Sequence, residues 1–133
     1  MSIDIGLNLA SKQFEYDYRN VIRDAMSNGV NRFLLTGTDI RSSKRVLEFC
    51  KMFNTTDNIM KATSGIHPTH CGNLPNNWKD QLRKLHDNTN SISVGETGLD
   101  YYRSTNLDRK TQMNVFEEQV KISIELNKPL FLH

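Results

Sequence analysis

The apolar residues of this chain recur at two alternating spacings. Segments with an apolar residue at every second position predict β-strands, and segments with one at every third or fourth position predict amphipathic helices. The predicted strands span residues 3–9, 31–36, 59–65, 92–98 and 129–133. The predicted helices span residues 18–28, 40–52, 78–85 and 112–126. Strands that alternate with helices of this length indicate a parallel sheet with helical crossovers.

The same spacings predict which side chains face the core. Alternation gives the first strand one apolar face, made of Ile3, Ile5, Leu7 and Leu9. The helix over residues 112–126 is expected to bury one apolar stripe, made of Met113, Phe116, Val120, Ile124 and Leu126. The basic cluster at residues 41–45 is interpreted as the solvated face of the second helix, and His86 is expected to be solvated.

Polar residues that can carry chemistry lie at the C-terminal ends of the predicted strands. They are Asn8, Thr36, His67, Glu96 and His133. Open doubly wound sheets and β/α barrels both bind ligands at this edge. The chain lacks the glycine-rich phosphate-binding motifs that mark nucleotide-binding open sheets, which favours the barrel.

Chain length limits how much of a barrel can form. A complete β/α barrel needs roughly 250 residues, and the chain has 133. We therefore expect an α/β fold that is the N-terminal part of a (β/α)8 TIM barrel, about four and a half βα units. These units would form one incomplete domain over residues 1–133. A half-barrel has unpaired strand edges and exposed interior side chains, so the chain alone is predicted to be unstable or self-associating.

Glu96 is the first candidate for a catalytic group and metal ligand. Alternation places it on the same face as Ile92 and Val94, where it emerges from a packed strand. A buried carboxylate has to be paired, protonated or metal-bound, because burying its isolated charge is prohibitive. Its two oxygens can each hold one cation, as a two-metal site with ions about 3.5–4 Å apart requires. The alternative is a structural carboxylate that pairs with an arginine or a lysine.

Four further residues are candidates for the same site. His133 ends the strand that follows the one with Glu96, and imidazole suits zinc and other divalent transition metals. We assign His67, Asp100 and Arg103 to substrate binding. His67 also suits acid–base work, the Asp100 carboxylate suits orienting a metal ligand, and the Arg103 guanidinium suits gripping a phosphate. For each residue the alternative is an ordinary surface or chain-end side chain.

Composition narrows the class of protein only slightly. Hydrophobic residues make up 37% and charged residues 24% of the chain, as in ordinary globular proteins. The formal net charge of +2 makes no electrostatic case for nucleic acid by itself. Cys50 and Cys71 form no disulfide framework, and there is no membrane-spanning run or signal peptide. We therefore expect an intracellular protein, cytoplasmic or nuclear, with no membrane partner.

Three motifs together resemble the TatD-type metal-dependent deoxyribonucleases. They are Gly65-Ile66-His67-Pro68, Val94-Gly95-Glu96-Thr97-Gly98-Leu99-Asp100-Tyr101 and Pro129-Leu130-Phe131-Leu132-His133. The resemblance covers essentially the whole chain in the right order, and residues 3–9 and 68–72 are similar to the eukaryotic branch of the family. It implies the N-terminal half of an amidohydrolase-like barrel that cleaves phosphodiester bonds in DNA with divalent metal ions. Glu96 matches the metal-bridging glutamate of the family, and His133 matches its next metal-binding histidine.

The chain departs from the family pattern at two places. Bacterial members begin with a His-x-His pair where this chain has Gly6 and Asn8. Glycine has no side-chain ligand and an asparagine oxygen is a weak zinc ligand, so Asn8 is expected to bind metal only weakly. This shifts the expected metal toward Mg²⁺ or Mn²⁺, with Zn²⁺ as the third choice. A later histidine and a final aspartate, both family ligands, have no counterpart here.

The expected function is a metal-dependent hydrolase that cleaves DNA with a metal-activated water. Two alternatives stay open. In the first, the chain is an inactive truncated fragment or one half of a split protein, which self-associates or needs a missing C-terminal half. In the second, the chain is a hydrolase of a substrate other than nucleic acid. Relatives of that last kind typically hold a lysine where Glu96 stands, which argues against it.

Overall fold

The computed structural model describes residues 2–102 and 109–133. Its strands are β1 (Ser2–Leu7), β2 (Val30–Leu35), β3 (Met60–Ser64), β4 (Ser91–Thr97) and β5 (Leu130–Leu132). Its helices are α1 (Tyr18–Ser27), α2 (Ile40–Phe53), α3 (Trp78–Leu85) and α4 (Arg109–Leu126), with short 3-10 helices η1 (Lys12–Phe14) and η2 (Pro68–Asn73). Each predicted strand and helix is present within a few residues of its predicted bounds. No helix in the two described ranges is long and apolar enough to cross a bilayer.

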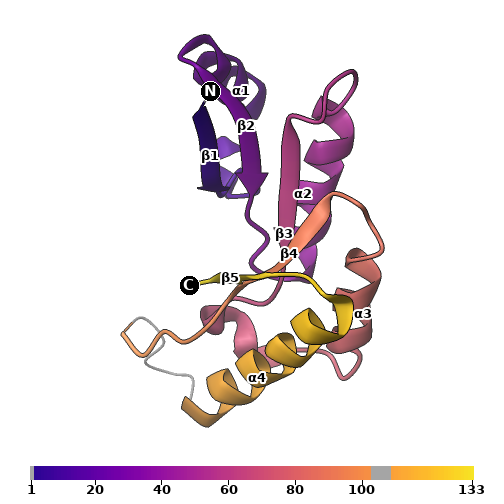
Figure 1. Ribbon diagram of the computed structural model, residues 1–133. Coiled ribbons are helices and arrows are strands. Elements are labelled where there is room, and N and C mark those ends of the chain that lie inside the picture. The colour runs from indigo at the N-terminus through magenta and orange to yellow at the C-terminus, as the bar shows by residue number, and fades with distance from the viewer. Residues whose placement is uncertain (1, 103–108) are drawn as a thin grey trace.

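The strands form one parallel sheet in the order β1-β2-β3-β4-β5. Because each strand lies beside its neighbour in the sequence, right-handed crossovers place all the helices on one side of the sheet. Figure 1 shows the strands following a curved path with the helices outside it. A doubly wound sheet instead reverses its strand order and carries helices on both faces. The structure therefore confirms the expected half-barrel.

The outer face of the sheet packs against the helices through two main clusters. The larger cluster joins β2 and β3 to α1 and α2, and its buried members include Ile22, Phe33, Leu35, Val46, Phe49 and Met60. The smaller cluster joins β4 to α3 and α4 through Val94, Leu82 and Ile122. These contacts hold the strands in a fixed curvature, which sets where their C-terminal ends meet.

The faces of β1 do not follow the simple alternation that the sequence predicts. Ile3 and Ile5 are 54% and 67% exposed. Asp4, which lies between them, pairs with Phe33 of β2, and Phe33 packs against the helices. Ile3 and Ile5 therefore lie on the opposite face of the sheet. Leu7, by contrast, packs against the outer cluster. The register between β1 and β2 shifts between Ile5 and Leu7, where Gly6 has a φ of +108°. This irregularity turns Leu7 to the other face, so the predicted single apolar face is wrong.

The buried face of α4 also differs from the predicted apolar stripe. Met113 and Ile124 are 37% and 74% exposed. The buried residues of the helix are Gln112, Val115, Gln119, Ile122 and Ser123. Three of these five side chains are polar, so apolar spacing alone misplaces the buried face, although Leu126 of the predicted stripe packs against the core cluster. The glutamines are buried because their amides pair with backbone groups of neighbouring segments.

His86 is buried rather than solvated, which overturns another expectation. It is 6% exposed, and its Nε2 lies 3.1 Å from the carbonyl oxygen of Ser64. Its Nδ1 lies 3.0 Å from Ser91 Oγ, and Lys128 Nζ donates to the His86 carbonyl oxygen at 2.7 Å. Two of these partners lie 22 and 42 residues away in the sequence, so the local pattern after α3 does not reveal the burial.

Candidate metal centre

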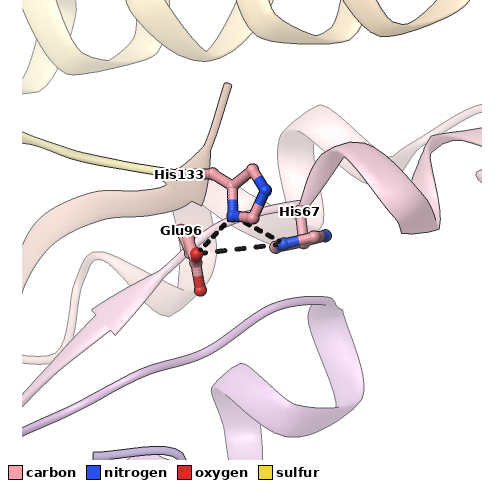
Figure 2. Close-up of side chains that lie close together, drawn as sticks. All are labelled: His67, Glu96 and His133. Atoms are coloured by element: carbon pink, nitrogen blue, oxygen red, sulfur yellow. Dashed lines mark hydrogen bonds and ion pairs between the residues drawn. The ribbon is translucent and has the colours of Figure 1, made fainter. Parts of the chain in front are cut away.

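The C-terminal ends of β3, β4 and β5 bring three side chains together. His67 follows β3, Glu96 lies near the end of β4, and His133 follows β5. Figure 2 shows the three pointing toward one another, with His133 Nδ1 2.8 Å from Glu96 Oε1 and 3.1 Å from His67 Nε2. His67 Nε2 and Glu96 Oε1 are 3.8 Å apart. The sequence predicts metal binding by Glu96 and His133 and substrate binding by His67; the structure gathers all three around one point.

Two glycines allow the strand ends to approach this closely. A Cβ atom on Gly65 would collide with the backbone of Gly95, and a Cβ atom on Gly95 would collide with the carbonyl group of Phe131. Gly95 also has a φ of +145°, which residues with side chains rarely adopt. The β4–β5 register shifts directly after Gly95. Alternation therefore fails here: Val94 packs against α3 and α4, whereas Glu96 turns to the two histidines.

Thr69 sets the orientation of the His67 ring. The backbone nitrogen of Thr69 lies 3.1 Å from His67 Nδ1, and its hydroxyl oxygen lies 2.6 Å from the same atom. An unprotonated Nδ1 accepts from the amide, and a protonated Nδ1 donates to the hydroxyl, so the ring is held in either tautomer. Burial is the main cause that lowers the pKa of His67, against the opposing charge of Glu96. The ring is therefore neutral at neutral pH, the form that binds metal.

Asp100 supports His133 from the side of the ring that faces away from Glu96. Its Oδ2 lies 3.4 Å from His133 Nε2, and its side chain is 5% exposed. Because Nδ1 faces Glu96 and His67, Nε2 is the nitrogen that can donate to this carboxylate. A carboxylate behind a metal-binding imidazole fixes the tautomer and raises the basicity of the ligating nitrogen. These contacts suit the ligand-orienting role that the sequence suggests for Asp100.

Two predicted site residues remain, and the structure describes only one of them, Asn8. Asn8 follows β1 and is exposed. Among the described residues, its side chain forms no hydrogen bond with any of the three clustered side chains. Arg103 lies outside the described residues, so its contact with a phosphate stays a prediction. Thr69 is the contact that sequence reasoning missed, although a hydroxyl two residues after a histidine is a usable signal for local side-chain pairing.

A groove opens beside the cluster on the same edge of the sheet. Its volume is about 920 Å³, and it lies between the segment after β1 and the first half of α2. Its lining includes Asn8, Lys12, Arg41, Lys44 and His70. His70 connects the groove to the cluster, because its ring centre lies 5.9 Å from that of His67. The predicted solvated face of α2 thus forms one wall of a groove.

The donor atoms of the cluster fit a divalent cation. Two imidazole nitrogens and a carboxylate oxygen lie within 4.8 Å of one another. Lone pairs that converge in this way repel unless a shared proton or a cation lies among them. Nitrogen and carboxylate donors are the ligands of zinc and related divalent metals. Within the described part of the chain, Glu96 Oε2 forms no hydrogen bond, which leaves it available to a second cation.

Comparisons with known proteins identify the family of the chain. The family model described as TatD related DNase matches residues 3–133. The 3'-5' ssDNA/RNA exonuclease TatD of Erwinia tasmaniensis is 34% identical over 130 residues, which cover 98% of this chain and 49% of that protein. The chain thus spans about half the length of the curated relatives it matches.

Two solved structures share the fold. A hydrolase TatD family protein from Entamoeba histolytica superposes with a TM-score of 0.89 at 26% identity, over 99% of this chain and 49% of that one. A TatD homologue from Escherichia coli has a TM-score of 0.82 at 22% identity, over 99% and 50%, and shows the fold alone. Membership of the eukaryotic branch stays a prediction. From the matched family model and the shared fold, the chain belongs to the TatD-related DNase family.

Proposed function

We propose that this chain provides the N-terminal half of a metal-dependent nuclease that hydrolyses phosphodiester bonds in DNA. The observation that carries the proposal is the convergence of two imidazoles and a carboxylate at the C-terminal edge of the sheet. That edge is where β/α barrels carry their active sites. Membership of a DNase family and a relative named as a 3'-5' ssDNA/RNA exonuclease support a nucleic-acid substrate, and we propose single-stranded DNA.

The chemistry that we propose depends on a bound divalent cation. Such a cation supplies a water of lowered pKa and a positive charge beside the phosphoryl oxygens. His67, Glu96 and His133 would hold it, and Glu96 would act as the bridging carboxylate because its Oε2 is available. Asp100 would keep the proton on His133 Nε2, so that the Nδ1 lone pair faces the site.

The identity of the metal is part of the proposal. Two imidazoles favour Zn²⁺. Gly6 and Asn8 stand where bacterial members of the family have a His-x-His pair, so two nitrogen ligands are absent there. Their absence favours Mg²⁺ or Mn²⁺ and makes full occupancy by Zn²⁺ less favourable. The remaining ligands of a two-metal site would come from the C-terminal half of the barrel.

The groove beside the cluster supports a phosphodiester substrate. Lys12, Arg41 and Lys44 line it, and none of them forms an ion pair within the described residues. The lining also contains the acidic residues Glu15, Asp39 and Glu48. Glu48 pairs with Arg45, and Asp39 accepts from the backbone of Ser42 at the start of α2. Unpaired cations attract the phosphates of a single strand, and this attraction weakens as salt is added. We propose that the strand enters the metal centre along this groove.

Two further proposals concern partners and location. The edges of β1 and β5 would be covered by a C-terminal half, or by a second copy of the chain when that half is absent. An intracellular location, cytoplasmic or nuclear, stays a prediction from the sequence.

Cleavage of labelled single-stranded DNA with added Mg²⁺, Mn²⁺ or Zn²⁺ tests the proposed function. Glu96→Ala should abolish cleavage, because it removes the only carboxylate that contacts both histidines in the described residues. Glu117→Ala removes the same charge from the exposed face of α4 and should leave cleavage unchanged. Equal cleavage by wild type and Glu96→Ala would remove Glu96 from the mechanism. No cleavage by any of the proteins would favour the inactive-fragment alternative.

A further inference from the structure

Two glutamines of α4 are completely buried on the side of the helix that faces the metal centre. Gln112 and Gln119 are both 0% exposed. They lie seven residues apart, which is about two turns of helix, so their side chains share one face. Each side-chain amide makes the same pair of hydrogen bonds, one accepted and one donated, with the backbone of a single distant residue.

Gln119 pairs with the residue that precedes His67. The backbone N–H of Ile66 donates to Gln119 Oε1 at 2.8 Å, and Gln119 Nε2 donates to the Ile66 carbonyl oxygen at 3.0 Å. The segment has left β3 at this point. The glutamine amide therefore takes the place of a neighbouring strand and fixes the backbone directly before the imidazole.

Gln112 does the same for the residue behind His133. The backbone N–H of Asp100 donates to Gln112 Oε1 at 2.8 Å, and Gln112 Nε2 donates to the Asp100 carbonyl oxygen at 3.1 Å. The Asp100 side chain then lies 3.4 Å from His133 Nε2. Through this pairing α4 fixes the carboxylate that orients the second imidazole.

Packing alone does not explain these two side chains. Burying an amide is costly, and an apolar residue of similar size would fill the same space without that cost. The amide is favourable only because it satisfies a backbone donor and a backbone acceptor that would otherwise be buried unpaired. Both backbone residues adjoin or belong to the metal centre, whereas Ile122 on the same face belongs to the apolar core cluster with Leu82 and Val94.

We propose that Gln112 and Gln119 are positioning residues of the metal centre. Through them one rigid helix holds the His67 segment and the Asp100 segment at a fixed separation, so that the two imidazoles and Glu96 converge. The inference rests on the proposed metal-dependent function. Residues that orient metal ligands from behind typically change metal affinity 10- to 100-fold when they are replaced.

Titration of the whole 133-residue chain with Co²⁺, followed by its visible absorption, tests the inference. Gln112→Met and Gln119→Met keep the side-chain length but cannot pair with the backbone. Each should weaken Co²⁺ binding by at least about 10-fold and change the absorption bands. Gln81→Met is the matched control, since within the described residues the Gln81 side chain on α3 bonds to the Asn77 side chain of the same region and to no residue of the site.

Ile122→Ala separates positioning from general loss of stability. It removes a completely buried side chain that belongs to the apolar core cluster on the same face of α4. It should lower the melting temperature but leave the Co²⁺ affinity and bands of the folded protein unchanged. Equal affinity in the glutamine variants and wild type, or an equal loss in Ile122→Ala, would overturn the inference.

A metal-free measurement distinguishes failure of this inference from failure of the proposed function. In NMR spectra without metal, Gln119→Met should shift the ring signals of His67, and Gln112→Met should shift those of His133. If wild type bound no Co²⁺, the proposed metal function would fail, and these signals would still decide the positioning roles. Unshifted ring signals in both variants would reject those roles.

Discussion

At the scale of single residues, the partner of each histidine determines which ring nitrogen is available. His67 is held at Nδ1 by Thr69, and His133 is held at Nε2 by Asp100. The opposite nitrogens, His67 Nε2 and His133 Nδ1, therefore face each other and Glu96. The motifs predict that His133 and Glu96 are metal ligands. The place of His67 beside them depends on how the strand ends converge. That convergence requires the close approach at Gly95 and does not follow from alternation.

Histidine burial predicts a loss of stability in mild acid. Burial is the main cause that lowers the pKa of His86, with the Lys128 charge acting in the same direction and Asp87 opposing it. Burial likewise lowers the pKa of His67. An unfolded chain has histidine pKa values near the usual ~6.5, so it binds more protons than the folded chain once the pH falls below that value. The free energy of unfolding should therefore fall as the pH drops from 7.5 to 5.5.

Urea unfolding at the two pH values measures this effect. His86→Gln keeps hydrogen-bonding groups at the position but cannot be protonated, so its pH dependence should be smaller than that of wild type. An identical pH dependence in wild type and His86→Gln would contradict the role of His86.

At the scale of elements, the existence and order of strands and helices follow from the sequence, whereas the faces follow only in part. Hydrophobic spacing locates α4 but selects Met113 and Ile124 as core residues, and both are exposed. Its buried face is set by Gln112 and Gln119, which are polar and pair with segments far away in the sequence. Likewise, the irregularity at Gly6 reverses the face of β1 in a way that period-two spacing cannot anticipate.

Helix α2 provides a direct test of the groove. Lys44→Glu places a negative charge in the groove, whereas Lys51→Glu makes the same change near the end of the same helix, outside the groove. Lys44→Glu should weaken binding of a single-stranded oligonucleotide in EDTA and lower the salt slope by about 0.7 for each phosphate that the variant no longer neutralises. Fluorescence anisotropy at several salt concentrations gives both quantities. Equal weakening by the two variants would show that the groove has no special role.

At the scale of the whole molecule, the chain is a half-barrel whose inner face is only partly covered. Phe131 on β5 reaches across to β1, where its ring lies 3.4 Å from the position that a Cβ atom of Gly6 would occupy. Ile3 and Ile5 nevertheless remain more than half exposed. Exposed apolar side chains on an unpaired edge strand favour association with another protein surface.

We predict that the chain self-associates through the exposed apolar side chains of this inner face. The 133-residue chain should sediment as a dimer or larger species at micromolar concentration, or melt without a sharp transition. Ile5→Lys should reduce association, because it places a charge on the edge strand. Ile124→Lys replaces an apolar residue of similar exposure on α4, outside the inner face, and should leave association unchanged. A sharp, cooperative melting transition from a demonstrated monomer would contradict this expectation.

The central claim is that His67, Glu96 and His133 together hold a divalent metal ion. Crystals of the chain soaked with Zn²⁺ test it most directly, through an anomalous difference map recorded at the zinc edge. The predicted result is a peak about 2.0–2.2 Å from His67 Nε2, His133 Nδ1 and a Glu96 carboxylate oxygen, and no such peak in Glu96→Ala. A map in which zinc binds elsewhere, or in which the three side chains surround no peak at saturating metal, would contradict the claim.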